Sequence, residues 1–185
     1  MSVRVKRWLL LIVLIGGVVA VDQMSKQHVI DSLLVGETVE LVPALAPYFQ
    51  ITRSYNTGSA FGFLPEAGDL FLIIAVIVVI GLVLFYERIP DEASITRIAT
   101  GLVCGGALGN AIDRIRHEHV VDFIHYRIPD VISNISNLAD HAIVLGVILI
   151  FIDSLRLERA ERRAAKAGNL PENSPAEIQR ESQQD

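Results

Sequence analysis

The sequence predicts an all-α membrane protein with four transmembrane helices, a small extracytoplasmic β-sheet and a surface loop or helix. The first observation behind this prediction is composition, because 51% of the 185 residues are hydrophobic. The second is that the hydrophobic residues are gathered into four runs, each near or somewhat below the roughly 20 residues needed to cross a bilayer. We place the spans at about residues 8–25, 69–87, 95–113 and 137–156, within one domain over residues 1–160.

The distribution of Lys and Arg orients these spans. Arg4, Lys6 and Arg7 precede the first span, and a second basic cluster follows the last one between residues 156 and 166. Because cytoplasmic flanks carry the excess of positive charge, we expect both termini in the cytoplasm. The segments 26–68 and 114–136 are then extracytoplasmic.

The C-terminal segment 161–185 contains much of the acidic charge behind the formal net charge of −5. It has no apolar period, so we predict a disordered cytoplasmic tail. Since the acidic charge belongs to this tail, the charge balance indicates no nucleic-acid partner.

The first span starts after basic residues and ends in small ones, as a cleavable signal peptide does. The three further spans favour a retained membrane anchor. Asp22 interrupts the apolar run, and Lys26 lies four residues later, at the spacing of an ion pair on one helix face. We expect this pair to form while the Lys26 ammonium reaches outward to the membrane surface.

The segment that follows, residues 37–65, alternates weakly and contains aromatic residues between turn signals. This pattern predicts a small sheet on the membrane surface. Asn56 opens the motif NTGSAFGF, where its amide has two interpretations. It either caps the turn or presents a polar group to a ligand.

The third span combines close packing with polar residues at its outer end. Glycines recur at four-residue spacing from Gly101 to Gly109, a pattern that lets membrane helices approach closely. Asn110, Asp113 and Arg114 follow. The two charged residues either pair locally or reach other helices, and structural support and substrate contact both remain open.

Two further aspartates lie at the outer ends of the third and fourth spans. Asp122 is embedded in the apolar sequence VVDFI, and Asp140 lies one turn inside the fourth span, three residues after Asn137. Helix capping is the structural alternative for Asn137 and in part for Asp140. Together with the polar residues of the other spans, they lie at one depth of the outer leaflet. Polar groups at membrane depth usually face a bundle interior and carry function, so we predict a single site there.

Two close aspartates have a specific use. If Asp122 and Asp140 lie about 4 Å apart at an effective dielectric constant of about 20, their repulsion is about 4 kcal/mol. One then holds a proton while the other stays ionised. The carboxylate takes a proton from an attacking water, and the acid polarises the carbonyl and supplies a proton to the leaving amine. This chemistry is aspartyl peptide hydrolysis, with asparagines available to hold the substrate backbone.

The motifs VDQMSK, NTGSAFGF, GGALGNAIDRI, VVDFI and NLADHAI occur in this order around the four spans. Over about residues 8–155 the chain therefore resembles prolipoprotein signal peptidase, also called signal peptidase II, aspartyl peptidase family A8. The resemblance implies an aspartic endopeptidase of the bacterial inner membrane. Its substrates are lipid-modified prolipoproteins, cut just before the diacylglyceryl-modified cysteine, and its site lies on the extracytoplasmic side.

The resemblance also implies the roles of individual residues. The catalytic pair is Asp122 and Asp140. The positions that bind substrate or support the site are Asp22, Lys26, Asn56, Gly58, Asn110, Asp113, Arg114, Asn137 and Ala139. Contact with membrane lipid and inhibition by the cyclic peptide globomycin are implied as well, and we expect a monomer without metal or cofactor. Ser136 and His141 depart from the family pattern, which commonly has Phe and a small residue there.

Two other functions compete with this interpretation. His117, His119, His125 and His141 lie near the two aspartates in sequence and are potential ligands of a membrane metallohydrolase. No HExxH motif accompanies them. Intramembrane Asp and Asn also line ion pathways in transporters, but the second span has no polar residue in its middle, and the polar groups gather in one leaflet.

Overall fold

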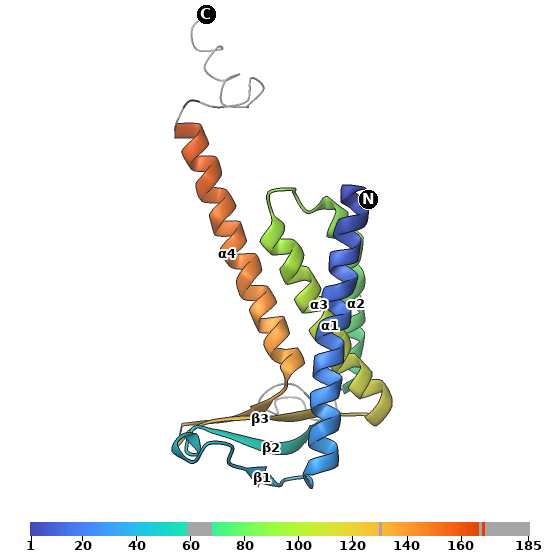
Figure 1. Cartoon of the computed structure of the whole chain (residues 1–185), viewed down its shortest axis with the longest axis vertical. Helices are drawn as coiled ribbons and strands as arrows, with labels where there is room; N and C mark the ends of the chain where they lie inside the picture. Colours follow the sequence, from blue (N-terminus) through green and yellow to red (C-terminus); the bar gives the residue numbers. More distant parts are fainter. Residues whose placement is uncertain (59–67, 130, 167, 169–185) are drawn as a thin grey trace, which may run out of the picture.

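The computed structural model describes residues 1–58, 68–129, 131–166 and 168, and within them four long helices form a bundle (Figure 1). Each helix is long and apolar enough to cross a membrane, which confirms the four predicted spans. The helices are α1 (Val3–Ser32), α2 (Gly68–Phe85), α3 (Ser94–His117) and α4 (Leu138–Lys166). A short 3-10 helix, η3 (Tyr86–Arg88), continues α2.

Two helices extend further than the sequence predicts. α1 continues beyond residue 25 to Ser32, because its last turns pack on the sheet through Val29. α4 continues to Lys166, so residues 161–166, which we predicted to be disordered, are helical. This part of α4 is rich in helix-forming residues and is braced by an ion pair between Glu158 and Arg162, four residues apart.

α3 is the central helix and packs against α1, α2 and α4. Gly101, Gly105 and Gly109 make the close approaches that their spacing predicts, and Gly106, outside that spacing, makes another. A Cβ atom added to Gly101 would lie 2.7 Å from Leu14 Cβ of α1, and one added to Gly106 would lie 2.4 Å from the Ala139 carbonyl oxygen of α4. Any larger residue would push these helices apart, so the small residues bring the polar ends of α1, α3 and α4 together.

A four-stranded antiparallel sheet lies across the end of the bundle opposite the N-terminus and the C-terminal end of α4 (Figure 1). The strands are β1 (Thr38–Val39), β2 (Phe49–Asn56), β3 (Val120–Ile128) and β4 (Ile132–Ser136), paired in that order, and the 3-10 helix η1 (Pro43–Leu45) lies between the first two. The predicted sheet is therefore confirmed. Two of its strands arise from the segment 114–136, in which we predicted no strand. The β-branched and aromatic residues of VVDFIHYRI favour one there.

The connections of this sheet place it against the bundle. β3 begins shortly after α3, and Glu118, the residue that caps the C-terminus of α3, adopts a left-handed conformation with φ of 63°. β4 ends at Ser136, and α4 begins two residues later at Leu138. The start of β3 and the start of α4 therefore lie next to each other where the sheet meets the bundle.

Candidate active site

Asp122 and Asp140 come together at this junction, as the sequence predicts. Asp122 lies in the buried first half of β3 and is 2% exposed, whereas Asp140 lies half-buried in the first turn of α4. Both contact Asn137, the residue between the end of β4 and the start of α4. Its Nδ2 donates to Asp122 Oδ1 at 2.6 Å, and its Oδ1 accepts from the Asp140 backbone N–H at 3.0 Å.

The backbone N–H of Asn137 in turn donates to Asp140 Oδ2 at 3.2 Å. This reciprocal pair of bonds is the capping-box arrangement of a helix N-terminus. The capping alternative is thus correct for Asn137 and Asp140, and the same groups also join the two aspartates.

Two other asparagines donate to the same carboxylates. Asn56 accepts from the Gly58 backbone N–H at 3.1 Å, and its Nδ2 donates to Asp122 Oδ2 at 2.9 Å. Asn110 donates from Nδ2 to Asp140 Oδ1 at 2.7 Å. The turn-cap interpretation of Asn56 is therefore correct, and its N–H is directed at Asp122.

A buried ionic cluster lies behind the aspartates. Lys26 contacts Asp22 at 2.8 Å and Asp113 at 2.9 Å, and all three side chains are almost fully buried. The predicted pair of Asp22 and Lys26 is confirmed. The prediction that Lys26 reaches outward is wrong, because the carboxylate of Asp113 and the amide oxygen of Asn110 hold the ammonium inside the bundle.

The cluster also fixes the elements that carry the aspartates. Asp22 Oδ1 accepts from the Ala139 backbone N–H of α4 at 3.0 Å, and Asp113 Oδ2 accepts from the Val121 N–H of β3 at 3.1 Å. Gln23, which we did not identify from the sequence, donates to both carboxylates of the cluster. Its position next to Asp22 in VDQMSK was the available signal.

Arg114 does not pair with the adjacent Asp113. Its guanidinium lies over the ring of Phe71 at 5.7 Å and donates to the Gly58 carbonyl at 3.4 Å. Its Nε is buried without a hydrogen-bond partner among the described residues. Arg114 therefore reaches another helix, as one of the two predicted alternatives states.

A cavity of about 580 Å³ opens in front of Asp140. Its polar wall includes Asn56, Asn110 and Arg114, and its apolar wall includes Phe71 of α2 and Val144 of α4. Val144 is 58% exposed on the outer surface of the bundle. The cavity therefore joins a polar site to a surface that lipid covers when the helices span a membrane.

Burial and charge both perturb Asp122. Burial is the main cause that raises the pKa of its carboxyl from the ordinary 3.8 to about 7, and the charge of Asp140 acts in the same direction. The amides of Asn56 and Asn137 act in the opposite direction, since they stabilise the ionised form. Repulsion from Asp140, which we expected between the two carboxyl groups, therefore contributes to the raised pKa of Asp122, and removal from water contributes more.

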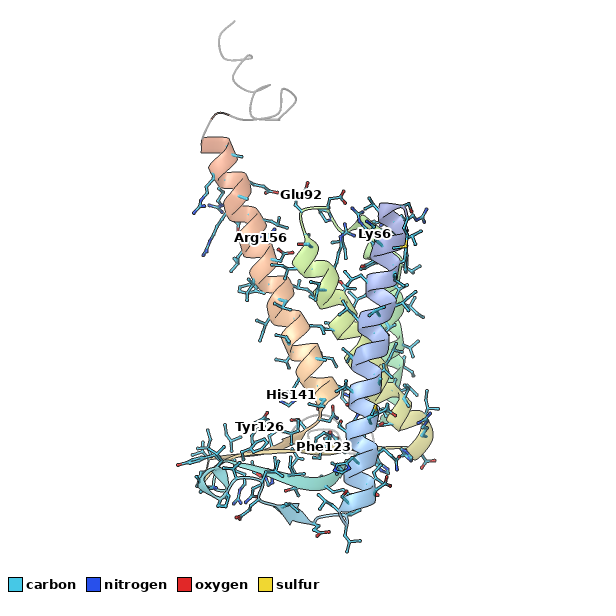
Figure 2. The ribbon with its side chains drawn as sticks, in the orientation of Figure 1. Lys6, Glu92, Phe123, Tyr126, His141 and Arg156 are labelled. Carbon is cyan, nitrogen blue, oxygen red and sulfur yellow. The ribbon has the colours of Figure 1, made fainter. Side chains whose placement is uncertain are left out.

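The four histidines of the metal alternative do not gather at one site, although the rings of His117 and His119 lie 5.9 Å apart. The His119 ring stacks on Tyr55 with centroids 3.8 Å apart, and His125 lies between hydroxyl groups of β2 and β4. His141 lies at the start of α4 beside Tyr126, with 2.9 Å between His141 Nε2 and the Tyr126 hydroxyl (Figure 2). In the part of the chain that the structure describes, no group of three or more His, Cys, Asp or Glu has metal-binding geometry.

Comparisons with known proteins show the family of the chain. The family model described as signal peptidase (SPase) II matches residues 14–156. The chain belongs to the signal peptidase II family. It is therefore a multi-pass membrane protease of the lipoprotein-processing class, and the rival metallohydrolase and ion-pathway functions are not needed to explain its polar residues.

Individual relatives match over most of their length. The chain is 39% identical to a lipoprotein signal peptidase of Pelotomaculum thermopropionicum over 157 residues, 83% of this chain and 99% of the relative. It is 37% identical to that of Bacillus subtilis over 138 residues, 75% of this chain and 88% of the relative. A solved bacterial membrane enzyme at 33% identity has a TM-score of 0.70, with 89% of this chain and 93% of that chain covered.

Proposed function

We propose that this signal peptidase II cleaves its substrate with Asp122 and Asp140 as an acid–base pair acting on water. The observation that carries the proposal is that Asn137 joins Asp122 and Asp140, which come from different elements, and that Asp140 lines a cavity. Asp122, with its raised pKa, holds a proton near neutral pH. Asp140, which lines the cavity, accepts hydrogen bonds from the Asn110 amide and the Asn137 backbone N–H, and these leave it placed to act as the base.

The reaction follows from these assignments. Asp140 takes a proton from water as the oxygen of that water bonds to the scissile carbonyl carbon, and the Asp122 proton stabilises the carbonyl oxygen. The C–N bond then breaks as Asp122 supplies a proton to the leaving amine. The carbonyl oxygen reaches Asp122 by replacing the Asn56 amide, because Asn56 lines the cavity and its N–H occupies Asp122 Oδ2.

The substrate is the membrane-embedded signal peptide of a prolipoprotein, cut just before the diacylglyceryl-modified cysteine. The continuity of the cavity with exposed apolar side chains such as Val144 supports a lipid-anchored substrate. Phe71 and Ile143 provide further apolar lining suited to acyl chains or apolar side chains. Globomycin, a cyclic peptide, is expected to compete for the same cavity.

We further propose that the site faces the extracytoplasmic side and that both termini are cytoplasmic. The basic residues at the start of α1 and in the last turns of α4 lie at the end of the bundle opposite the sheet. Figure 2 shows Lys6 and Arg156 at that end and Tyr126 and His141 at the other. This charge asymmetry supports the orientation by the positive-inside rule.

Asp122→Asn and Asp140→Asn test the proposal with a purified, lipid-modified prolipoprotein substrate. Each variant is expected to fold and to lose cleavage. Val131→Ala, an exposed change on the hairpin turn away from the cavity, is the matched control and should retain wild-type turnover. Wild-type turnover by either aspartate variant would show that the pair is misassigned.

A further inference from the structure

We infer that Lys26 is a positioning residue for catalysis: it holds the Asn110 amide in the one orientation in which Asn110 donates to Asp140. The inference rests on the proposed role of Asp140 as the base. It gives Lys26 a function beyond the stability of the helix bundle, because it acts through a neighbouring amide on the group that accepts the proton of water.

The distances define the relay. Lys26 Nζ lies 3.0 Å from Asn110 Oδ1, and Asn110 Nδ2 lies 2.7 Å from Asp140 Oδ1. An ammonium group is a donor only, whereas the two ends of an amide are nearly isosteric but opposite in hydrogen bonding. A flipped Asn110 would direct its N–H groups at the ammonium and its oxygen at the carboxylate. Both contacts would be repulsive, so Lys26 selects the productive orientation.

The ammonium itself is held in place. It has three N–H donors, and three acceptors surround it: the carboxylates of Asp22 and Asp113 and the amide oxygen of Asn110. Lys26 is 2% exposed, so water does not substitute for these partners. The donors and acceptors match in number, and no N–H is left to bind another group.

One neutral donor supports the same orientation. Asn137 Nδ2 lies 3.1 Å from Asn110 Oδ1, but the same Nδ2 also donates to Asp122 at 2.6 Å. Removal of Lys26 therefore leaves Asn110 with a weaker and shared partner. We expect the Asn110 amide to lose part of its preference for the orientation that donates to Asp140. The effect on turnover should be smaller than that of losing an aspartate.

The test must separate positioning from buried charge. Lys26→Met alone leaves two buried carboxylates without a cation, which is strongly destabilising. The paired change Lys26→Met with Asp113→Asn removes one positive and one negative charge, so the cluster keeps its net charge. This pair, Asn110→Leu, and the three changes together form a double-mutant cycle with the wild-type protein at constant cluster charge.

Steady-state cleavage of a lipid-modified prolipoprotein gives kcat and KM for each protein, and thermal unfolding in detergent reports folding. The paired change is expected to lower kcat roughly tenfold to 100-fold, the scale of one hydrogen bond to a charged group, with KM nearly unchanged. In the presence of Asn110→Leu it should lower kcat much less, because the amide through which Lys26 acts is absent.

Asp153→Asn is the control for destabilisation alone. Asp153 is buried in α4 and accepts from Thr96 of α3 far from the cavity, so its loss should reduce thermal stability and leave kcat unchanged. Equal losses of kcat with and without Asn110, or no loss at all, would overturn the role of Lys26. Retained activity in Asp122→Asn or Asp140→Asn would instead overturn the proposed function, so the two failures are distinguishable.

Discussion

Replacing Asp122 by Asn should stabilise the protein above pH 7 while it abolishes cleavage. The folded state raises the pKa of this carboxyl from 3.8 to about 7, mainly through burial. The folded protein therefore binds this proton more tightly than the unfolded chain does. The free energy of unfolding falls as the pH rises from about 4 to about 7, and the cost of the buried charge is complete above pH 7.

The size of the effect follows from the two pKa values. Their difference corresponds to about 4 kcal/mol at 1.36 kcal/mol for each factor of ten. Asn is neutral at every pH and avoids this cost. The protonated carboxyl of Asp122 and the amide of the variant each direct one donor group at the N–H of Asn56 or Asn137. This unfavourable contact is present in both proteins, so it does not change the difference in stability between them. We therefore expect up to about 4 kcal/mol of added stability at pH 8 and little difference near pH 4.

Thermal unfolding of the purified wild-type and variant proteins in the same detergent, at a series of pH values from 4 to 8, measures this difference. The midpoint of Asp122→Asn should rise above that of the wild type with increasing pH, by up to roughly 10 °C. A difference that stays constant or shrinks from pH 4 to pH 8 would refute the argument that burial suppresses ionisation of Asp122.

Three more predictions follow from the site and the helix contacts. Since the acid form of Asp122 is required, kcat should fall as the pH rises above about 7, as a pH–rate profile will show, and a plateau up to pH 9 would contradict this role. Gly106→Ala should lower the free energy of unfolding by about 1–3 kcal/mol, because its Cβ would lie 2.4 Å from a backbone oxygen. Gly81→Ala is the control, since a Cβ there would have nothing within 4 Å. Equal unfolding midpoints of the two variants would contradict the packing. Asp153→Asn should cost about 1 kcal/mol, because Asp153 accepts the Thr96 N–H in the first turn of α3, and an unchanged midpoint would contradict that role.

The sequence contains enough information to predict the membrane helices and the participants of the site. Apolar runs report spans directly because the bilayer fixes their length. The ordered motifs place Asp122, Asp140 and the asparagines at one depth, and the structure brings them together. Local capping and site geometry were predicted as alternatives for Asn137, but one amide performs both, because its oxygen and nitrogen face different partners.

Long-range partners were harder to predict. The direction of Lys26 depends on Asp113, far along the chain, and no local periodicity reports that contact. The strands after residue 119 were also missed, because a short apolar segment beside a span resembles a loop or the end of a helix, and only pairing with β2 makes it a strand. Gln23 was missed for the same reason, since its importance comes from bridging two distant carboxylates.

The oriented asparagines have a consequence for the movement of protons. Each has its oxygen turned to a group that can only donate: a backbone N–H for Asn56 and Asn137, and the Lys26 ammonium for Asn110. An amide neither gains nor loses a proton near neutral pH, so these three asparagines contact the aspartates without transferring protons to or from them. Among these described side chains, proton exchange with the cavity therefore falls to Asp140, which lines it.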